Sequence, residues 1–192
     1  LYILSGQVVF NFFSGATTDA MSSIISNGPL IKKVYVPKYL FVLSRIISSF
    51  INLLASFTAL LLVMIATRAE LHWKVVLVVI PLILLVVFSL GVGLVLAAIT
   101  VKFRDVMHLY SVFTTALMYL TPVIYPMSIL PNWLYKLVML NPLTNMLMMF
   151  RDVMINNNIF DLKSLIIAII ETALMFLIGL YVFYKNQDEF IL

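Results

Sequence analysis

The sequence contains no cysteine, only two histidines and few charged residues. Without cysteine the chain has no disulfide, thiolate metal site or cysteine nucleophile, and His72 and His108 alone cannot build a histidine-rich metal site. No carboxylate pair, His/Glu metal motif or Ser/His constellation gathers within the apolar segments, so we predict no catalytic residue and no metal ligand. The twelve basic residues are scattered and form no stripe with interleaved aromatic rings, which argues against nucleic-acid binding.

The phosphate-binding pattern Gly-x-x-x-x-Gly-Lys-[Ser/Thr] is also absent, because none of the six glycines begins one. We therefore expect no ATP hydrolysis and no cofactor within this chain. The energy for any active transport would have to come from a partner protein or from an ion gradient.

Apolar residues make up 64% of the chain and charged residues only 10%, and the mean hydropathy is +1.13. This leaves too little polar surface to cover a water-soluble globule, so the surface must face lipid. A helix needs about 20 apolar residues to cross a hydrocarbon core of ~30 Å. We predict an all-α, polytopic helical bundle in the membrane, with five spans at about residues 1–25, 46–66, 75–99, 109–125 and 162–184.

The apolar stretch between Tyr125 and Asp161 is interrupted by prolines. Residues 132–140 and 142–154 would form helices of about 14 Å and about 20 Å, which are too short to cross a membrane. Asn141 as N-cap, followed by Pro142 in the first helical position, is a favourable helix start. We predict that residues 126–154 form an external re-entrant pair of half-helices.

Lysine and arginine set the predicted orientation. Seven basic residues would lie on the side of the loop at residues 27–45, against five on the other side, which places that loop in the cytoplasm. The chain begins at Leu1 rather than methionine, and five spans would leave residue 1 outside. We therefore expect it to be part of a longer protein with at least one preceding span.

Four stretches of the sequence form a recognisable pattern: Asn11-Phe12-Phe13 followed by Ser26-Asn27 and Leu30 to Pro37; Val101 to Asp105; Pro122 to Pro126; and Asn141-Pro142-Leu143 with Phe150-Arg151. Taken together and in order, they resemble the permease subunits of type-2 ABC exporters. The resemblance is to the branch that exports O-antigen, capsule and teichoic-acid-like glycans, and it covers essentially the whole chain. Thr121 stands where that branch more often has serine.

This resemblance implies a homodimeric permease in the bacterial cytoplasmic membrane that carries a lipid-linked glycan. Each subunit would have six spans and would work with a separate ABC ATP-binding subunit, which binds ATP and Mg. Residues 27–38 would form a coupling helix on that ATPase, with the turn at 102–105 as a second contact. A solvated positive-inside loop, or one resting on anionic lipid, fits the same residues. The predicted coupling residues are Lys32, Lys33, Tyr35, Pro37, Lys38, Lys102, Arg104 and Asp105.

Polar residues inside the spans are candidates for a substrate path. Ser44, Ser48, Asn52 and Ser56 recur at every fourth residue and form one helix face, which either lines a path or bonds to a neighbouring helix. Glu171 lies nine residues inside an apolar span, where an ionised carboxylate is costly, so it has either a transport role or a structural partner. The small residues Ser89, Gly93 and Ala97 predict close approach of another helix.

Aromatic rings can stack on the apolar face of a sugar, although membrane aromatics also serve as interface anchors or packing residues. Phe10 and Phe13 share one helix face, and Tyr110 and Phe113 share another. Tyr125 and Trp133 lie near the predicted outer mouth. Arg151 with Asp152 would form either a latch on the external gate or an ion pair at headgroup level. The candidate path and gate residues are Phe10, Phe13, Tyr110, Phe113, Pro122, Tyr125, Pro126, Trp133, Asn141, Pro142, Arg151 and Glu171.

Two alternatives to a glycan exporter remain open. The first is a drug or lipid exporter of the same superfamily, whose Asn-Pro motif looks similar. The second is an ion-driven carrier or channel, for which broken half-helices and an intramembrane glutamate are also typical.

Overall fold

The computed structural model describes residues 1–31, 33, 36–68 and 72–187, and its regular structure there is entirely helical. Lys32 and Tyr35, two of the predicted coupling residues, lie outside the described residues. The helices are α1 (Tyr2–Ser26), α2 (Gly28–Ile31), α3 (Tyr39–Ala66), the 3-10 helix η1 (Trp73–Val78), α4 (Val79–Lys102), α5 (Val106–Leu120), the 3-10 helix η2 (Met127–Ile129), α6 (Asn132–Met139), α7 (Pro142–Met154) and α8 (Leu162–Asn186).

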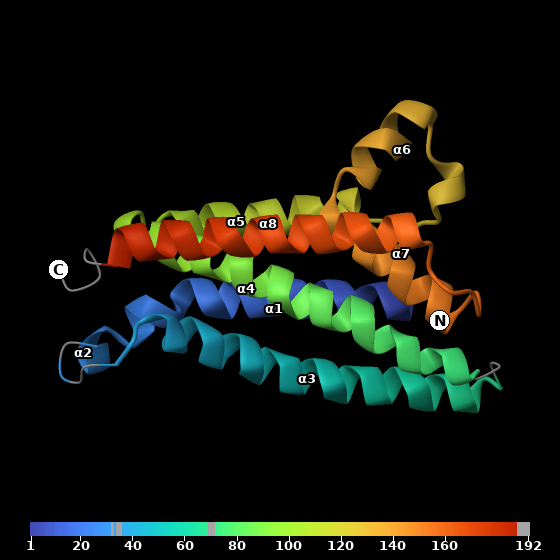
Figure 1. The fold of residues 1–192 in the computed structure, drawn as a ribbon, viewed down its shortest axis with the longest axis horizontal. Coiled ribbons are helices and arrows are strands. Elements are labelled where there is room, and N and C mark those ends of the chain that lie inside the picture. The colour runs from blue at the N-terminus through green and yellow to red at the C-terminus, as the bar shows by residue number, and fades with distance from the viewer. Residues whose placement is uncertain (32, 34–35, 69–71, 188–192) are drawn as a thin grey trace.

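The long helices form an elongated bundle with α4 at its centre (Figure 1). α4 packs against both α1 and α8, and α3 packs mainly on α1. The interior is apolar and includes Met21, Ile46, Leu85 and Leu147, which are almost completely buried. α6 projects from one end of the bundle, whereas α7 inserts between α1, α4 and α8.

Small residues allow α4 to contact its two neighbours closely. A Cβ atom added at Gly93 would come within 2.7 Å of the Cβ of Ala20 on α1. One added at Gly91 would come within 2.8 Å of the backbone of Met175 on α8. The predicted close approach of a helix at the ridge of Ser89, Gly93 and Ala97 is thereby confirmed.

In the part of the chain that the structure describes, three helical segments are long and apolar enough to cross a membrane: α3, η1 together with α4, and α8. α1 has 25 residues but carries too many polar side chains to meet the same hydropathy criterion. α5 has 15 residues and is therefore about 22 Å long, short of a full crossing. The prediction of five spans stays a prediction.

Two predicted segment ends differ from the structure. α3 begins at Tyr39 rather than at residue 46, because a helix can extend beyond the apolar core that hydropathy detects, so the connection after α1 ends earlier than residue 45. α5 ends at Leu120 rather than at residue 125. Thr121 is extended, with φ −92° and ψ 134°, as expected for a residue before proline, and residues 121–126 form a turn instead of a last helical turn.

The two short helices form as predicted, as α6 and α7, and their external, re-entrant placement stays a prediction. Asn141 caps α7 by accepting a hydrogen bond from the backbone N–H of Leu143 at 3.2 Å, with Pro142 in the first turn. The Asn141 amide also donates to the hydroxyl of Thr121 at 2.9 Å, so the cap ties α7 to the turn after α5. α7 is buried over most of its length, whereas α6 is exposed and Trp133 has 70% of its surface accessible.

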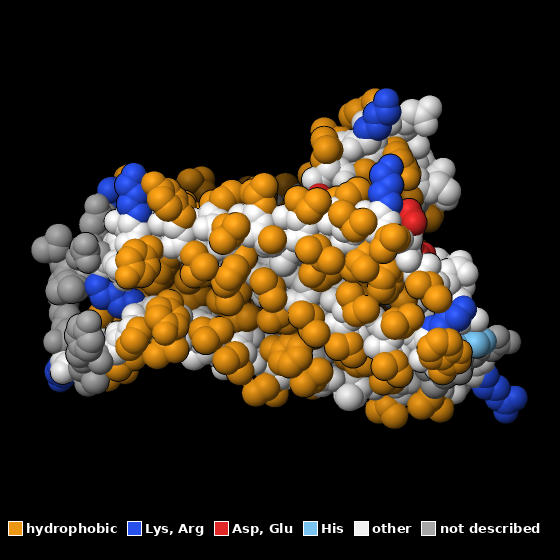
Figure 2. All heavy atoms as spheres, viewed as in Figure 1, with side chains coloured by type: hydrophobic (Ala, Val, Ile, Leu, Met, Phe, Trp, Pro, Cys, Tyr) orange, Lys and Arg blue, Asp and Glu red, His pale blue; other side chains and the backbone are white. Residues whose placement is uncertain are grey.

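Hydrophobic side chains cover the long flank of the molecule, and lysine and arginine gather towards its two ends (Figure 2). α2 and the C-terminal end of α8 lie at one end of the bundle, while α6 and the N-terminus lie at the other (Figure 1). The segments predicted to be cytoplasmic and external are therefore sorted to opposite ends. Which end faces the cytoplasm stays a prediction.

Candidate functional site

A polar groove runs between α1 and α3. It consists of two adjoining cavities of about 140 Å³ and about 240 Å³, which share Val8, Asn11 and Ser56. We call it the α1–α3 groove. Its polar lining residues are Gln7, Asn11, Asp19, Ser49, Asn52 and Ser56.

The groove forms where polar positions of two helices meet: Gln7, Asn11 and Asp19 of α1, and Ser49, Asn52 and Ser56 of α3. On α3, Ser44, Ser48, Asn52 and Ser56 are exposed on one face, and the last two line the groove. On α1, polar side chains follow the same helical period and are exposed or half-buried. The α1 stripe, which the sequence prediction missed, could have been found from its spacing of three and four residues: Gln7, Asn11, Ser14, Thr18 and Ser22.

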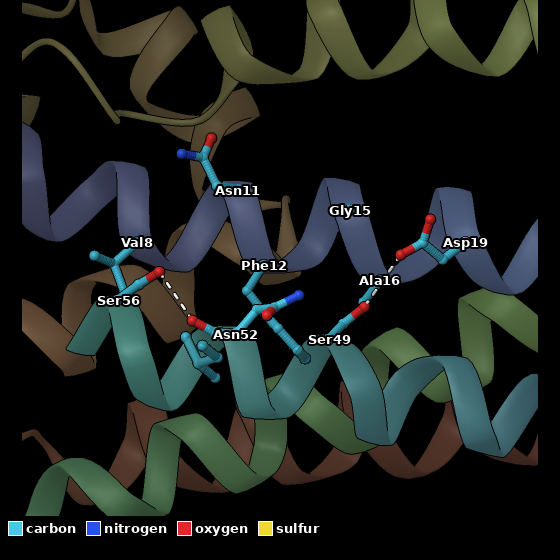
Figure 3. Close-up of a pocket in the computed structure, with 10 residues that line it drawn as sticks. Val8, Asn11, Phe12, Gly15, Ala16, Asp19, Ser49, Asn52 and Ser56 are labelled. Atoms are coloured by element: carbon cyan, nitrogen blue, oxygen red, sulfur yellow. Dashed lines mark hydrogen bonds between the residues drawn. The ribbon is translucent and has the colours of Figure 1, made fainter. Parts of the chain in front are cut away.

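Figure 3 shows how the groove residues lie. The Ser56 hydroxyl donates to the backbone carbonyl of Asn52 at 2.9 Å, and Ser49 donates to the Asp19 carboxylate at 3.4 Å. Within the described ranges, the side-chain amides of Gln7, Asn11 and Asn52 have no hydrogen-bond partner. Each amide offers two donors and an acceptor, so the groove has unused hydrogen-bonding capacity while its hydroxyls are satisfied by their own helix or by Asp19.

Such a groove cannot face lipid hydrocarbon. Each polar group left unpaired in hydrocarbon costs several kcal/mol, and ionised side chains are rare except at protein-lined or water-filled spaces. The groove must therefore contact water, a polar substrate or another polar protein surface. A hydroxyl-rich ligand matches the free amides, because every sugar hydroxyl both donates and accepts.

Several aromatic candidates are packing residues instead. Phe13 is 3% exposed and stacks on Phe88 of α4 with ring centroids 5.9 Å apart, and Phe10 is also buried. This corrects the prediction that these two rings face a path, because α1 turns them into the core and presents its amides to the groove. Tyr110 is likewise buried, and its hydroxyl donates to Thr17 at 2.6 Å.

The remaining rings are accessible. Phe113 is 56% exposed on α5, and its ring lies 6.0 Å from that of Tyr110. Tyr125 is half-buried and donates its hydroxyl hydrogen bond to the backbone of Tyr119 at 2.8 Å. Trp133 is exposed on α6, well separated in the fold from the groove between α1 and α3.

Arg151 of α7 joins three segments at the end of the bundle where the N-terminus lies, and it is only 3% exposed. Its Nη1 atom donates to the carbonyl of Pro122 at 2.6 Å, and Nη2 donates to the carbonyls of Tyr2 and Val123 at 3.0 Å and 2.9 Å. Nε donates to the hydroxyl of Ser5 at 3.3 Å, and the guanidinium lies 3.6 Å from the centre of the Tyr2 ring. We call this arrangement the Arg151 clamp. It holds α7, the start of α1 and the turn after α5 together.

The Arg151 clamp explains why position 6 is a glycine, and it makes no use of the neighbouring Asp152. A Cβ atom at Gly6 would lie 2.6 Å from Nη2 of Arg151 and 2.9 Å from the Val123 carbonyl, so only glycine fits there. Burial lowers the pKa of Arg151, and the neighbouring Tyr2 opposes this with a smaller effect. The guanidinium stays charged, because the ordinary pKa of arginine is far above neutral pH. Asp152 accepts a hydrogen bond from Asn156 at 3.0 Å. Among the described residues the hydrogen bonds of Arg151 go to backbone carbonyls and the Ser5 hydroxyl and none goes to Asp152, so the structure shows no ion pair between these two residues, and the gate latch stays a prediction.

Glu171 points towards protein, as its helix face predicts. The Asn145 amide of α7 lies near its carboxylate and donates to the Ser164 carbonyl at 3.1 Å. The carboxylate oxygen Oε2 is buried and has no hydrogen-bond partner in the described part of the chain. Asn145 is thus a candidate structural partner, and a transport role stays a prediction as well.

The described coupling residues lie at the end of the bundle opposite the clamp. Lys38 donates to the backbone carbonyl of Gln187, just beyond α8, so it links the α1–α3 connection to the C-terminal helix. Lys33, Pro37, Lys102, Arg104 and Asp105 are exposed. Among the residues that the structure describes, no group of three or more His, Asp or Glu side chains could hold a metal ion.

Comparison with known proteins gives consistent matches. The sequence pattern described as "ABC-2 type transporter" matches residues 1–155. The chain is 24% identical over 194 aligned residues to an O-antigen export system permease protein of Klebsiella pneumoniae, covering 99% of this chain and 73% of that protein. It is also 24% identical to the protein of the same description from Myxococcus xanthus, covering 98% of this chain and 74% of the relative.

Proposed function

The chain belongs to the ABC-2 type transporter family, and on this premise we propose that it is the permease subunit of an exporter for an O-antigen-type polysaccharide. A separate ABC subunit binds ATP and Mg and drives transport, since the phosphate-binding pattern is absent from this sequence. The proposed setting is the bacterial cytoplasmic membrane, with a lipid-linked glycan as substrate. The names of the relatives favour a glycan over a drug or a lipid.

The α1–α3 groove is the observation that carries this proposal. Three unpaired amides and one carboxylate on a membrane bundle require a polar occupant, and a glycan supplies both donors and acceptors along its length. A homodimer would enclose such a groove.

Deleting the gene is expected to remove the surface polysaccharide and to leave lipid-linked polymer inside the cell. Complementation with the double variant Asn11→Leu, Asn52→Leu should export roughly fivefold to a hundredfold less than the wild type, because two hydrogen bonds at about 0.5–1.5 kcal/mol each are lost. Surface and intracellular polymer are measured on immunoblots, with protein level checked in the membrane fraction.

Thr58→Leu is the matched control. Thr58 is also exposed on α3, but it does not line the groove and its hydroxyl is satisfied by the Ala55 carbonyl at 2.7 Å. Normal export by the double leucine variant would contradict a path through the groove. Absence of intracellular polymer in the deletion strain would contradict glycan export itself.

Charge reversal in the α1–α3 connection tests the ATPase contact. Lys32→Glu with Lys33→Glu should lower the amount of co-purified ATPase subunit roughly tenfold, because each reversal removes up to ~1 kcal/mol of attraction and adds repulsion. Membrane insertion should be unchanged. Lys185→Glu is the control, since it makes the same change at an exposed position at the same end of the bundle. An undiminished ATPase yield from the double variant would refute this docking site.

A further inference from the structure

A third cavity lies beside the Arg151 clamp at the outer end of the bundle. Its volume is about 200 Å³, room for roughly seven waters at ~30 Å³ each, which is about the space of one sugar ring. We call it the outer cavity. It is lined by Tyr2, Pro126, Met127, Ser128, Met148, Arg151, Asp152, Ile155 and Asn156.

The outer cavity is separate from the α1–α3 groove. No residue lines both, and α1 is the one element that they share: the groove lies between α1 and α3, whereas this cavity lies between the start of α1, the segment at residues 126–128 and the end of α7. The clamp fixes its walls, because Arg151 bonds both α1 and the turn after α5. The space is therefore held open by rigid contacts on three sides.

The polar groups of the cavity have unused hydrogen-bonding capacity. The Oδ1 atom of Asp152 accepts a hydrogen bond from the side-chain amide of Asn156. The other carboxylate oxygen of Asp152 and the side-chain oxygen of Asn156 have no hydrogen bond to the described part of the chain. Ser128 is exposed, and its hydroxyl has no partner among the described residues. Arg151 makes four hydrogen bonds and has five N–H groups, so one remains.

The charge balance and the apolar walls select the ligand class. Arg151 and Asp152 contribute one charge of each sign, so the cavity is neutral overall, and the carboxylate would repel a phosphate. Tyr2, Met127, Met148 and Ile155 supply apolar surface opposite the polar groups. One polar and one apolar side is the pattern of a pyranose ring, whose hydroxyls need donors and acceptors while its C–H face packs on apolar groups.

We propose that the outer cavity binds one neutral hexopyranose residue of the exported glycan, with Asp152, Asn156 and Ser128 contacting its hydroxyls. This inference rests on the proposed glycan export and adds a specific contact at the exit. Such a site would hold the emerging chain at the outer end while the ATPase resets.

Cysteine labelling tests the proposal, because this sequence contains no native cysteine. Ser128→Cys is introduced into the full permease–ATPase complex in membranes, and the rate of modification by an impermeant maleimide is measured. The probes are the methyl glycosides of glucose, galactose, mannose and N-acetylglucosamine, with inorganic pyrophosphate as the anionic rival. At ten times its Kd, a bound glycoside should slow labelling about tenfold, since only the unoccupied fraction reacts.

Asn158→Cys is the matched control, because Asn158 is exposed next to the same helix end but does not line the cavity. Its labelling should be unaffected by any sugar. Adding Asp152→Asn to Ser128→Cys should abolish protection without changing the rate measured in the absence of sugar, because asparagine can still accept from Asn156.

Three results would overturn the proposal: no glycoside protects, pyrophosphate protects better than any glycoside, or the thiol introduced by Ser128→Cys is unreactive without ligand because protein fills the space. If surface polysaccharide is still exported by the same cysteine variant, these results reject the sugar site alone. If the proposed function itself is wrong, the deletion strain will contain no trapped polymer, so the two failures can be told apart.

Discussion

Arg151→Met is expected to destabilise the permease strongly and to abolish export. The variant leaves the buried carbonyls of Pro122 and Val123 without donors, at about 1–3 kcal/mol for each unsatisfied group, and it removes the contact with the Tyr2 ring. The sum of roughly 2–6 kcal/mol is a large share of the 5–15 kcal/mol typical of a folded protein. Thermal unfolding of the detergent-purified protein measures the loss.

Arg151→Lys and Lys136→Met complete this experiment. Lysine keeps the positive charge, but it lacks the planar guanidinium group that donates to several carbonyls at once. An intermediate loss of stability is therefore expected for Arg151→Lys. Lys136 is an exposed cation on α6, and its replacement by methionine should be nearly neutral. A melting temperature for Arg151→Met equal to that of Lys136→Met would show that the clamp contributes nothing.

Gly91→Ala and Gly179→Ala are expected to disrupt the contact between α4 and α8. A methyl group at Gly91 would lie 2.8 Å from the backbone of Met175, and one at Gly179 would collide with the backbone of Gly91. Backbone atoms cannot move aside as a flexible side chain can, so the helices must separate, at a typical cost of about 1–3 kcal/mol or more. The yield of monodisperse protein and its melting temperature report the effect.

Gly15→Ala is the internal control for these variants. Nothing lies within 4 Å of a Cβ atom at Gly15, which is also in the middle of a helix. Alanine there should stabilise the protein by roughly 0.5–1 kcal/mol, because glycine is the poorer helix former. A fall in melting temperature equal to that of Gly91→Ala would mean that loss of glycine as such, and not the helix contact, is responsible.

Local signals in the sequence predicted the broken segment well. Asn141 is a favourable N-cap residue and Pro142 is favourable in the first helical position, so the beginning of α7 could be predicted without knowledge of tertiary contacts. Pro122 likewise keeps the preceding residue, Thr121, out of the helical conformation, so that α5 ends at Leu120. A hydropathy window averages across that break, which is why the predicted span extended to residue 125. Hydropathy finds the lipid-crossing part of a helix, which explains why it missed the first turns of α3.

The clamp shows what sequence reasoning could not supply. Arg151 and Asp152 are adjacent in the chain, yet neighbouring residues on a helix do not face each other, and Asp152 bonds Asn156 one turn later. Three of the four hydrogen bonds of Arg151 go to backbone carbonyls more than 25 positions away, and a carbonyl has no sequence signature. Phe13 illustrates the same limit, because its stacking on Phe88 depends on how α1 is rotated against α4.

The glycine contact between α4 and α8 also bears on how the bundle can move. Two helices that meet backbone to backbone have no side chains between them that could change rotamer, so they can neither roll nor slide without first separating. α5 is different, since only Tyr110, Thr114 and Leu117 of its side chains are buried. α5 is therefore less constrained by its neighbours than α4 and α8 are, and we expect relative movement of the helices to involve α5 rather than the contact between α4 and α8.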